Sequence, residues 1–76
     1  MIEKKVFETM AKILNIEPQM INYSSSSDNT DNWDSLKQLE IMTALEEEFN
    51  LEFEEEEIMN TTNTKDLVAL VKARLA

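Results

Sequence analysis

The sequence predicts an all-α fold: a four-helix bundle of three long helices and one short helix, with a long loop between the first and second helices. Two observations lead to this prediction. Apolar residues recur at steps of three and four along the chain, which is the spacing of amphipathic helices. No pair of segments shows the alternation of polar and apolar residues expected of paired strands. A length of 76 residues leaves room for one domain, residues 1–76.

The first predicted helix covers residues 2–15. Its apolar residues lie at helical spacing with charged residues between them, and they are Ile2, Val6, Phe7, Met10, Ile13 and Leu14. Pro18 cannot continue the helix, because its ring removes a backbone N–H and clashes with the preceding turn. We therefore expect the first helix to end just before this proline.

A long polar loop is predicted over residues 16–33. Its centre is a run of four serines, Ser24 to Ser27, followed by Asp and Asn residues that favour turns and local side-chain hydrogen bonds. A loop of this length in a small domain is often functional, and the alternative is a flexible tether. We expect Ile16, Met20 and Ile21 to hold its first half against the core.

The second predicted helix, residues 35–50, has the strongest periodicity. Its apolar stripe consists of Leu36, Leu39, Met42, Leu45 and Phe49. Either Asp34 or Ser35 can act as the N-cap, and Ser35 with Gln38 has the spacing of a capping box.

Two further helices complete the predicted bundle. Residues 54–59 favour a short helix, since acidic side chains at a helix start interact well with its dipole. Residues 63–75 form the last helix, with Thr62 or Asn63 as its N-cap. Lys72 and Arg74 stand near its end, where positive charge is favourable.

The composition excludes most kinds of enzyme. The chain contains no cysteine, no histidine and no glycine. It therefore offers no thiolate nucleophile, no imidazole for general base catalysis or zinc binding, and no glycine-rich phosphate loop. We expect a protein that is not itself an enzyme.

Charge indicates the kind of partner. The net charge is −9, and residues 31–57 hold eleven acidic residues against one base, Lys37. Such a surface repels nucleic acids and anionic membranes and attracts basic protein surfaces.

The four glutamates Glu54 to Glu57 favour diffuse cation binding, so we expect no defined metal site. No apolar run is long enough to span a bilayer and the N-terminus lacks the apolar stretch of a secretory signal, so we expect a cytoplasmic protein.

The Ser35 hydroxyl is the strongest candidate in the sequence for a functional group. Ser35 follows a long polar loop, so its hydroxyl should be exposed, and the N–H groups of a helix start stabilise a phosphate ester placed there. Without histidine the chain has no base to activate this hydroxyl, so Ser35 is better suited to modification by another enzyme. The alternative is that Ser35 is an ordinary helix cap.

The stretch Trp33-Asp34-Ser35-Leu36-Lys37-Gln38-Leu39-Glu40-Ile41, continued by Ala44-Leu45-Glu46-Glu47-Glu48-Phe49, resembles the acyl carrier proteins, as do the chain's length and helix order. The resemblance implies that Ser35 bears a 4'-phosphopantetheine arm, which a phosphopantetheinyl transferase adds from coenzyme A. The thiol of the arm would hold acyl groups as thioesters, which explains how a chain without cysteine can work through sulfur.

The resemblance also implies roles for the neighbouring residues. Asp34 and Leu36 would flank the cofactor. The surface presented to partner enzymes would comprise Leu36, Lys37, Glu40, Ile41, Thr43, Glu46 and Glu47, with Ile41 and Thr43 at exposed or half-exposed positions. Partners would be acyl-transferring, condensing or acyl-activating enzymes with basic docking patches, and the carrier would be a monomer.

Two residues depart from the pattern common in that family. Trp33 replaces a frequent glycine, and Lys37 replaces an acidic or small polar residue. Trp33 either packs over the loop or presents its ring to a partner. Both departures count against a housekeeping role in fatty-acid synthesis and allow a specialised carrier, so fatty-acid, polyketide and specialised lipid biosynthesis all stay open.

Methionines raise a further possibility inside the bundle. Met10, Met20, Met42 and Met59 would bring adaptable side chains into the core, where they either shelter an acyl chain or simply fill space.

Two rival hypotheses remain at this stage. One is a small acidic helical module that binds basic proteins without any prosthetic group. The other is a peptidyl-type carrier of amino acids, which the acid at position 34 disfavours.

Overall fold

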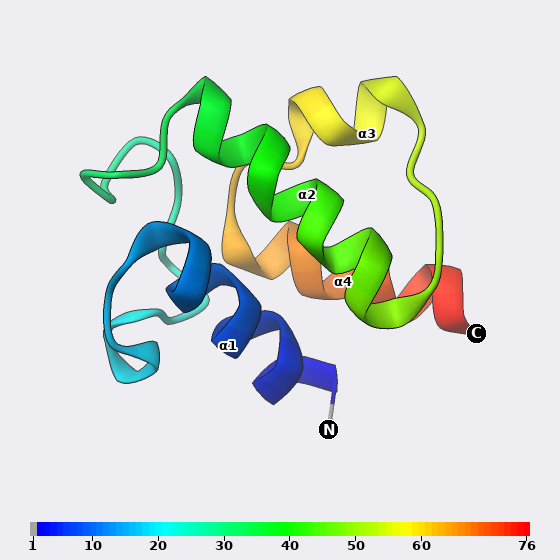
Figure 1. The fold of residues 1–76 in the computed structure, drawn as a ribbon, viewed down its shortest axis with the longest axis horizontal. Helices are drawn as coiled ribbons and strands as arrows, with labels where there is room; N and C mark the ends of the chain where they lie inside the picture. Colours follow the sequence, from blue (N-terminus) through cyan, green and yellow to red (C-terminus); the bar gives the residue numbers. More distant parts are fainter. Residues whose placement is uncertain (1) are drawn as a thin grey trace.

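The computed structural model describes residues 2–76 and confirms the all-α prediction (Figure 1). Its elements are α1 (Ile2–Leu14), a 3-10 turn η1 (Pro18–Met20), α2 (Ser35–Phe49), α3 (Glu55–Asn60) and α4 (Thr64–Leu75). Every helix boundary lies within one residue of its predicted position. In this part of the chain, the β structure consists of an isolated bridge between Ser26 and Asn63.

Two asparagines end the long helices α1 and α2. Asn15 and Asn50 have φ angles of 59° and 54°, in the left-handed region that glycine usually occupies after a helix. Asparagine tolerates this region better than other residues that have a Cβ. Backbone bonds from Ile16 N to Ala11 O and from Leu51 N to Glu46 O, both 3.0 Å long, then close the two helix ends.

The core forms where α1 packs against α2 and α4, while α3 packs on α2. Its fully buried side chains include Val6, Met10, Leu14, Ile41, Met42, Leu45, Leu67 and Val71. Met20 and Met59, by contrast, are 65% and 67% exposed. The prediction that four methionines enter the bundle is therefore right for Met10 and Met42 and wrong for the other two.

Helix α2 turns a different face inward than its apolar stripe predicts. Leu36 is 63% exposed and Leu39 is 50% exposed. The buried residues of the helix are instead Gln38, Ile41, Met42 and Leu45, which also follow helical spacing. The predicted stripe is correct from residue 42 onward and wrong in the first two turns.

The polar loop is packed onto the helices, contrary to the flexible-tether alternative. The Ser25 carbonyl accepts hydrogen bonds from the backbone N–H (2.9 Å) and the hydroxyl (3.1 Å) of Thr64, at the start of α4. Asn32 Nδ2 donates to the carbonyl of Leu14 at the end of α1 (3.0 Å). In the first half of the loop, Ile21 is buried as expected and Met20 is not. The loop therefore delivers the chain to α2 along a fixed path.

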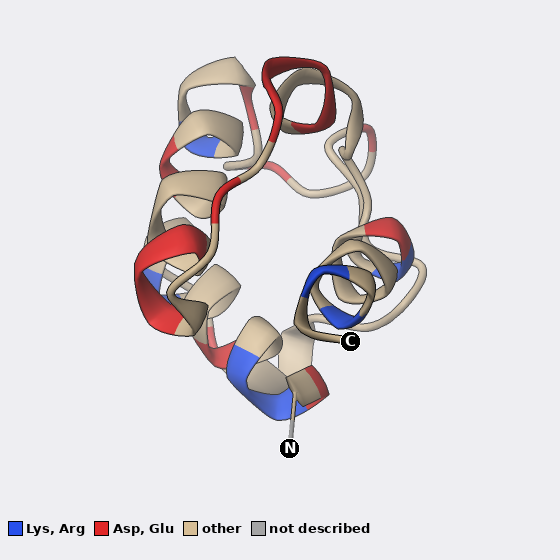
Figure 2. Cartoon of the chain, turned by 90° about the vertical axis from the view of Figure 1, so that its right-hand side faces the viewer, with Lys and Arg blue, Asp and Glu red and all other residues tan. Residues whose placement is uncertain are grey.

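Charge is divided between two sides of the bundle (Figure 2). Acidic residues cluster on α2, on α3 and on the segment that joins them, whereas the basic residues gather mostly on α1 and α4. Across residues 2–76, no helix combines the length and apolar character needed to cross a bilayer.

Candidate functional site at the start of helix α2

Helix α2 begins at an exposed serine whose neighbour performs the capping. Asp34 is the N-cap, with extended backbone geometry, and its Oδ1 accepts a hydrogen bond from the Lys37 N–H (2.8 Å). The Asp34 carbonyl accepts from the Gln38 N–H (2.8 Å). Ser35 is the first residue of the helix and is exposed. Of the two predicted caps, the structure selects Asp34, which leaves the Ser35 hydroxyl without a capping role.

Behind Ser35 lies a buried set of polar contacts, which we call the Trp33–Gln38 network. Trp33 Nε1 donates to Gln38 Oε1 (2.7 Å), and Gln38 Nε2 donates to the carbonyls of Ile58 and Thr61 (both 2.8 Å). Trp33 is 2% exposed and Gln38 is 6% exposed. The network joins the end of the loop, α2 and α3. Of the two alternatives for Trp33, the structure shows the ring packed inside, and Gln38 faces inward instead of forming a capping box.

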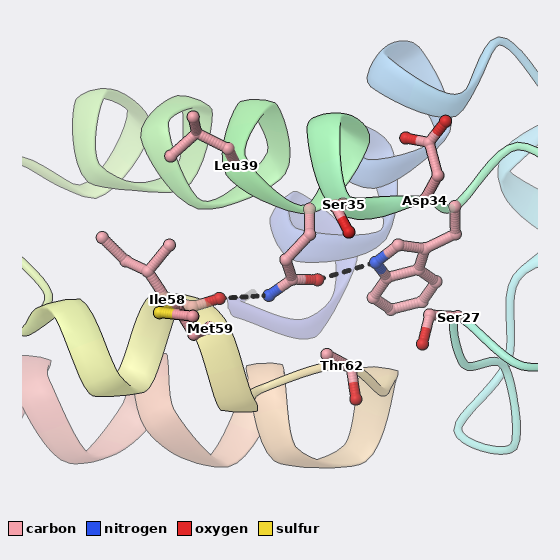
Figure 3. Close-up of a pocket in the computed structure, with 9 residues that line it drawn as sticks. Ser27, Asp34, Ser35, Leu39, Ile58, Met59 and Thr62 are labelled. Carbon is pink, nitrogen blue, oxygen red and sulfur yellow. Dashed lines mark hydrogen bonds between the residues drawn. The ribbon is translucent and has the colours of Figure 1, made fainter.

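An open groove of about 570 Å³ runs beside Ser35 between α2 and α3. Figure 3 shows Leu39 of α2 facing Ile58 and Met59 of α3 across one part of it, with Ser27 and Thr62 near the other part. Trp33 and Gln38 also line the groove. Sequence reasoning did not assign Ile58, Thr62 or Ser27 to this site, because they are distant from Ser35 along the chain and have no motif of their own. It named Met59 as possible shelter for an acyl chain but expected it in the core.

Most residues of the predicted partner surface are accessible, with one correction. Leu36, Thr43 and Glu47 are exposed, and Lys37 Nζ lies 3.5 Å from the Glu40 carboxylate in a half-buried pair. Ile41 was expected at an exposed or half-exposed position, but it is fully buried in the core. It points inward because it lies three residues after Gln38 and four before Leu45 on the buried face of α2.

Glu46 has a structural role that the sequence did not indicate. Its Oε2 accepts a hydrogen bond from the Phe53 N–H (2.8 Å), beyond the end of α2. Phe53 is itself 8% exposed and belongs to the core. The Glu46 carboxylate therefore helps to hold the segment that connects α2 to α3.

Glu57 of α3 is engaged by other groups of the protein. The N–H of Glu54 donates to Glu57 Oε1 (2.7 Å) as part of a capping box, and Arg74 of α4 forms an ion pair with Glu57. The hydrogen bond from Arg74 lowers the pKa of Glu57 below its ordinary value, and the Glu54 N–H acts in the same direction. Among residues 2–76, no three Asp or Glu side chains are grouped so as to hold a metal ion.

Comparison with known proteins identifies the class of protein, and the all-helical fold agrees with it. The family described as "Phosphopantetheine attachment site" matches residues 4–71. Acyl carrier protein of Buchnera aphidicola subsp. Baizongia pistaciae (strain Bp) is 37% identical over 71 residues, covering 93% of this chain and 91% of the relative. Acyl carrier protein of Clostridium acetobutylicum is 36% identical over 73 residues, covering 96% and 95%.

The chain is therefore a phosphopantetheine carrier domain. Within that class, it belongs to the acyl carrier protein family. Membership makes it a carrier and not a catalyst, and implies interaction with a phosphopantetheinyl transferase and with acyl-handling enzymes. The hypothesis of an acidic interaction module without a prosthetic group is not favoured.

The residues at the start of α2 fit a phosphopantetheine group. A phosphate ester on an exposed side chain at a helix N-terminus meets partial positive charge and N–H donors. The groove beside Ser35 offers both apolar side chains, Leu39, Ile58 and Met59, and polar ones, Ser27 and Thr62. When bound, the group supplies a thiol for thioester formation, which this cysteine-free chain does not contain.

Proposed function

We propose that the Ser35 hydroxyl is the attachment point of 4'-phosphopantetheine and that the chain presents acyl thioesters to partner enzymes. The observation that best supports this proposal is that Asp34, and not Ser35, caps helix α2. Asp34 caps α2 with its carboxylate, so the adjacent hydroxyl is free to be esterified without disturbing the helix start. A serine that itself capped the helix would instead hold its Oγ against a backbone N–H, which would leave the hydroxyl less accessible to a transferase.

The residues around Ser35 then have separate tasks. The helix start stabilises the charge of a phosphodiester on Ser35. Asp34 keeps the first turn of α2 in place. The side chains of Leu39, Ile58 and Met59 give the arm an apolar wall close to its attachment point.

The proposed partner surface surrounds this attachment point. It comprises Leu36, Lys37, Glu40, Thr43, Glu46 and Glu47, all on α2, and Ile41 drops out because it is buried. The acidic side seen in Figure 2 supports docking onto basic patches of acyl-transferring, condensing or acyl-activating enzymes. Such docking is fast and readily reversed, as a shuttle requires. We further propose that residues 1–76 act as one domain, as a monomer and in the cytoplasm, in fatty-acid, polyketide or specialised lipid synthesis.

Arm attachment can be tested by intact-mass measurement after incubation with coenzyme A and a broad-specificity phosphopantetheinyl transferase. The parent chain should gain the mass of one phosphopantetheine. Ser35→Ala should gain none, because it lacks the hydroxyl. Ser27→Ala is the matched control, since Ser27 lines the same groove but does not begin a helix, and it should be modified like the parent. Modification of Ser35→Ala, or none in the parent, would refute the proposal.

The docking surface can be tested by charge reversal at Glu47. This residue is exposed, whereas Glu46 also holds the Phe53 N–H and would confuse docking with folding. Glu47→Lys should weaken binding to the transferase roughly threefold to tenfold, which corresponds to about 0.7–1.4 kcal/mol. Glu8→Lys makes the same charge change on α1 and should bind like the parent. Equal weakening by both variants would show that net charge, and not the α2 surface, governs docking.

A further inference from the structure

We propose that the Trp33–Gln38 network closes the space between α2 and α3 to an alkyl chain, and that Trp33 and Gln38 thereby determine which acyl groups the carrier accommodates. The cargo would be short, or polar along its length, and would stay in the open groove instead of entering the core. This inference rests on the proposed attachment at Ser35. It assigns a selective role to two residues that do not belong to the partner surface.

The network lies in the groove beside the attachment point, and its two side chains are buried there. Ser35 and Gln38 line the same groove, one turn apart on α2. The Gln38 amide donates to the Ile58 carbonyl on α3 and accepts from the Trp33 indole N–H, and these two hydrogen bonds are the dashed lines in Figure 3. We expect an acyl chain attached at Ser35 to meet the hydrogen-bonded Gln38 side chain before it can reach Ile41 or Leu45 in the core.

The hydrogen-bonding groups in the network satisfy one another. Both N–H groups of the Gln38 amide can be used by the carbonyls of Ile58 and Thr61, and its oxygen accepts from Trp33. An alkyl chain that pushed between the helices would separate these groups and could not replace any of their hydrogen bonds. Buried polar groups without partners are strongly unfavourable. The apolar gain from burying the chain is therefore opposed at the first step of its entry.

The groove above the network gives only partial shelter. Leu39 and Met59 form its apolar edge and remain 50% and 67% exposed, so water reaches the space that they border. A short acyl group beside them loses little by staying there, and the hydroxyls of Ser27 and Thr62 nearby suit an acyl group with oxygen or nitrogen substituents. A long alkyl chain would remain largely in water.

The distribution of methionines agrees with this reading. Met10 and Met42 are fully buried parts of a packed core, while Met20 and Met59 lie at the surface. Of these four methionines, Met59 alone lines the groove beside Ser35, at its exposed edge, and the two in the core are already packed.

The test compares the parent chain loaded with acetyl- and octanoyl-phosphopantetheine from the corresponding acyl-coenzyme A. Intact mass first establishes that each arm is attached. The rate of thioester cleavage by hydroxylamine is then measured relative to the same thioester on free coenzyme A. In the parent, we expect the relative rates for the two acyl groups to agree within twofold. Trp33, the single tryptophan of the chain, reports on the network directly, and its emission and acrylamide quenching should be the same for both.

Opening the network should change this result. The variant Gln38→Leu replaces the amide that makes the hydrogen bonds with an apolar side chain. In this variant, the octanoyl thioester should be cleaved at least fivefold more slowly than in the parent, and the rate for the acetyl thioester should not change. If that variant does not fold, Trp33→Phe keeps an aromatic ring but removes the donor, and it should show the same selective protection.

Three results would contradict the inference, and the measurements distinguish them. Protection of octanoyl in the parent by fivefold or more, together with altered Trp33 quenching, would show that the chain enters and would overturn the inference. Absence of protection in a folded Gln38→Leu or Trp33→Phe chain would show that the network is not the barrier. A parent that gains no arm would refute the attachment at Ser35 and the inference with it, and the mass spectrum alone identifies that case.

Discussion

The two halves of helix α2 differ in how they use the same helical geometry. In the C-terminal half, Met42 and Leu45 are fully buried against the core. In the N-terminal half, Leu36 and Leu39 are largely exposed and the inward position belongs to Gln38. One half therefore anchors the bundle by burying apolar surface, and the other leaves apolar side chains accessible beside the serine. The comparison teaches that a single helix can divide its length between stability and function.

The elements that each half contacts strengthen this contrast. The anchoring half belongs to a core shared with α1 and α4. The site half faces α3, a helix of six residues, none of which is fully buried. Short helices with little buried apolar area depend on specific polar contacts, here from Gln38 and Arg74. We therefore expect α3 and the start of α2 to open more readily than the rest of the bundle.

The largest expected effect is the loss of stability on truncating a leucine in the anchoring half. Leu45→Ala should lower the free energy of unfolding by about 2–5 kcal/mol, because it leaves a cavity in the core. Leu39→Ala, the same substitution in the site half, should cost less than about 1 kcal/mol, since that side chain is half exposed. Urea unfolding followed by circular dichroism measures both. Similar losses would contradict the division of α2 into two halves.

Breaking the polar network should have the next largest effect. Gln38→Ala leaves the Trp33 N–H and two carbonyls without their partner, which should cost about 1–3 kcal/mol. The matched control is Gln19→Ala, at an exposed position of η1, with an expected change within about 0.5 kcal/mol. Hydrogen exchange should show the loss of protection concentrated in α3. Uniform loss across α1 and α4 would mean that the network supports the whole fold.

Local sequence signals were sufficient for the helices and for Ser35. The spacing of apolar residues, Pro18 and the capping residues Asp34 and Asn63 all act within a few residues, and the structure follows them closely. The exposed position of Ser35 followed from its place between a polar loop and a helix.

What the sequence could not provide depends on contacts between distant residues. A glutamine in an amphipathic helix is normally assigned to the solvent side, and only the carbonyls of Ile58 and Thr61, some 20 residues away, make its burial favourable. The inward turn of Gln38 and Ile41 displaced Leu36 and Leu39, so one unrecognised polar contact shifted the predicted face of two helical turns. The bond from Glu46 to Phe53 was missed for the same reason.

Removing the cap of α2 should give a smaller effect. Asp34→Ala loses the acceptor for the Lys37 N–H and should cost about 1 kcal/mol, while Asp34→Asn keeps an acceptor and should cost a few tenths. Asn63→Ala offers a comparison at α4, where Asn63 Oδ1 accepts from the Asp66 N–H at the same distance of 2.8 Å. Urea unfolding again provides the measurement. A loss for Asp34→Asn as large as that for Asp34→Ala would show that charge, and not hydrogen bonding, is what Asp34 contributes.

The smallest effect concerns pH and the ion pair that ties α3 to α4. Because Arg74 lowers the pKa of Glu57 in the folded chain below the ordinary value of 4.5, the pair stabilises the fold above pH 4.5. This contribution is lost as the pH falls through the lower, folded pKa. The Arg74→Gln variant should therefore be less stable than the parent at pH 7, and the difference should shrink as the pH drops below 4.5.

The double variant Arg74→Gln with Glu57→Gln separates this pair from other contacts. Arg74 also donates to the Glu52 carbonyl (3.2 Å), and that bond is independent of Glu57 titration. A coupling between the two substitutions that fades in acid would assign the pH dependence to the pair. A coupling near zero, with Arg74→Gln equally destabilising from pH 7 to pH 3, would mean that Arg74 supports α3 through the Glu52 carbonyl and not through Glu57. Either result measures how far the short helix beside Ser35 relies on contacts from outside α2.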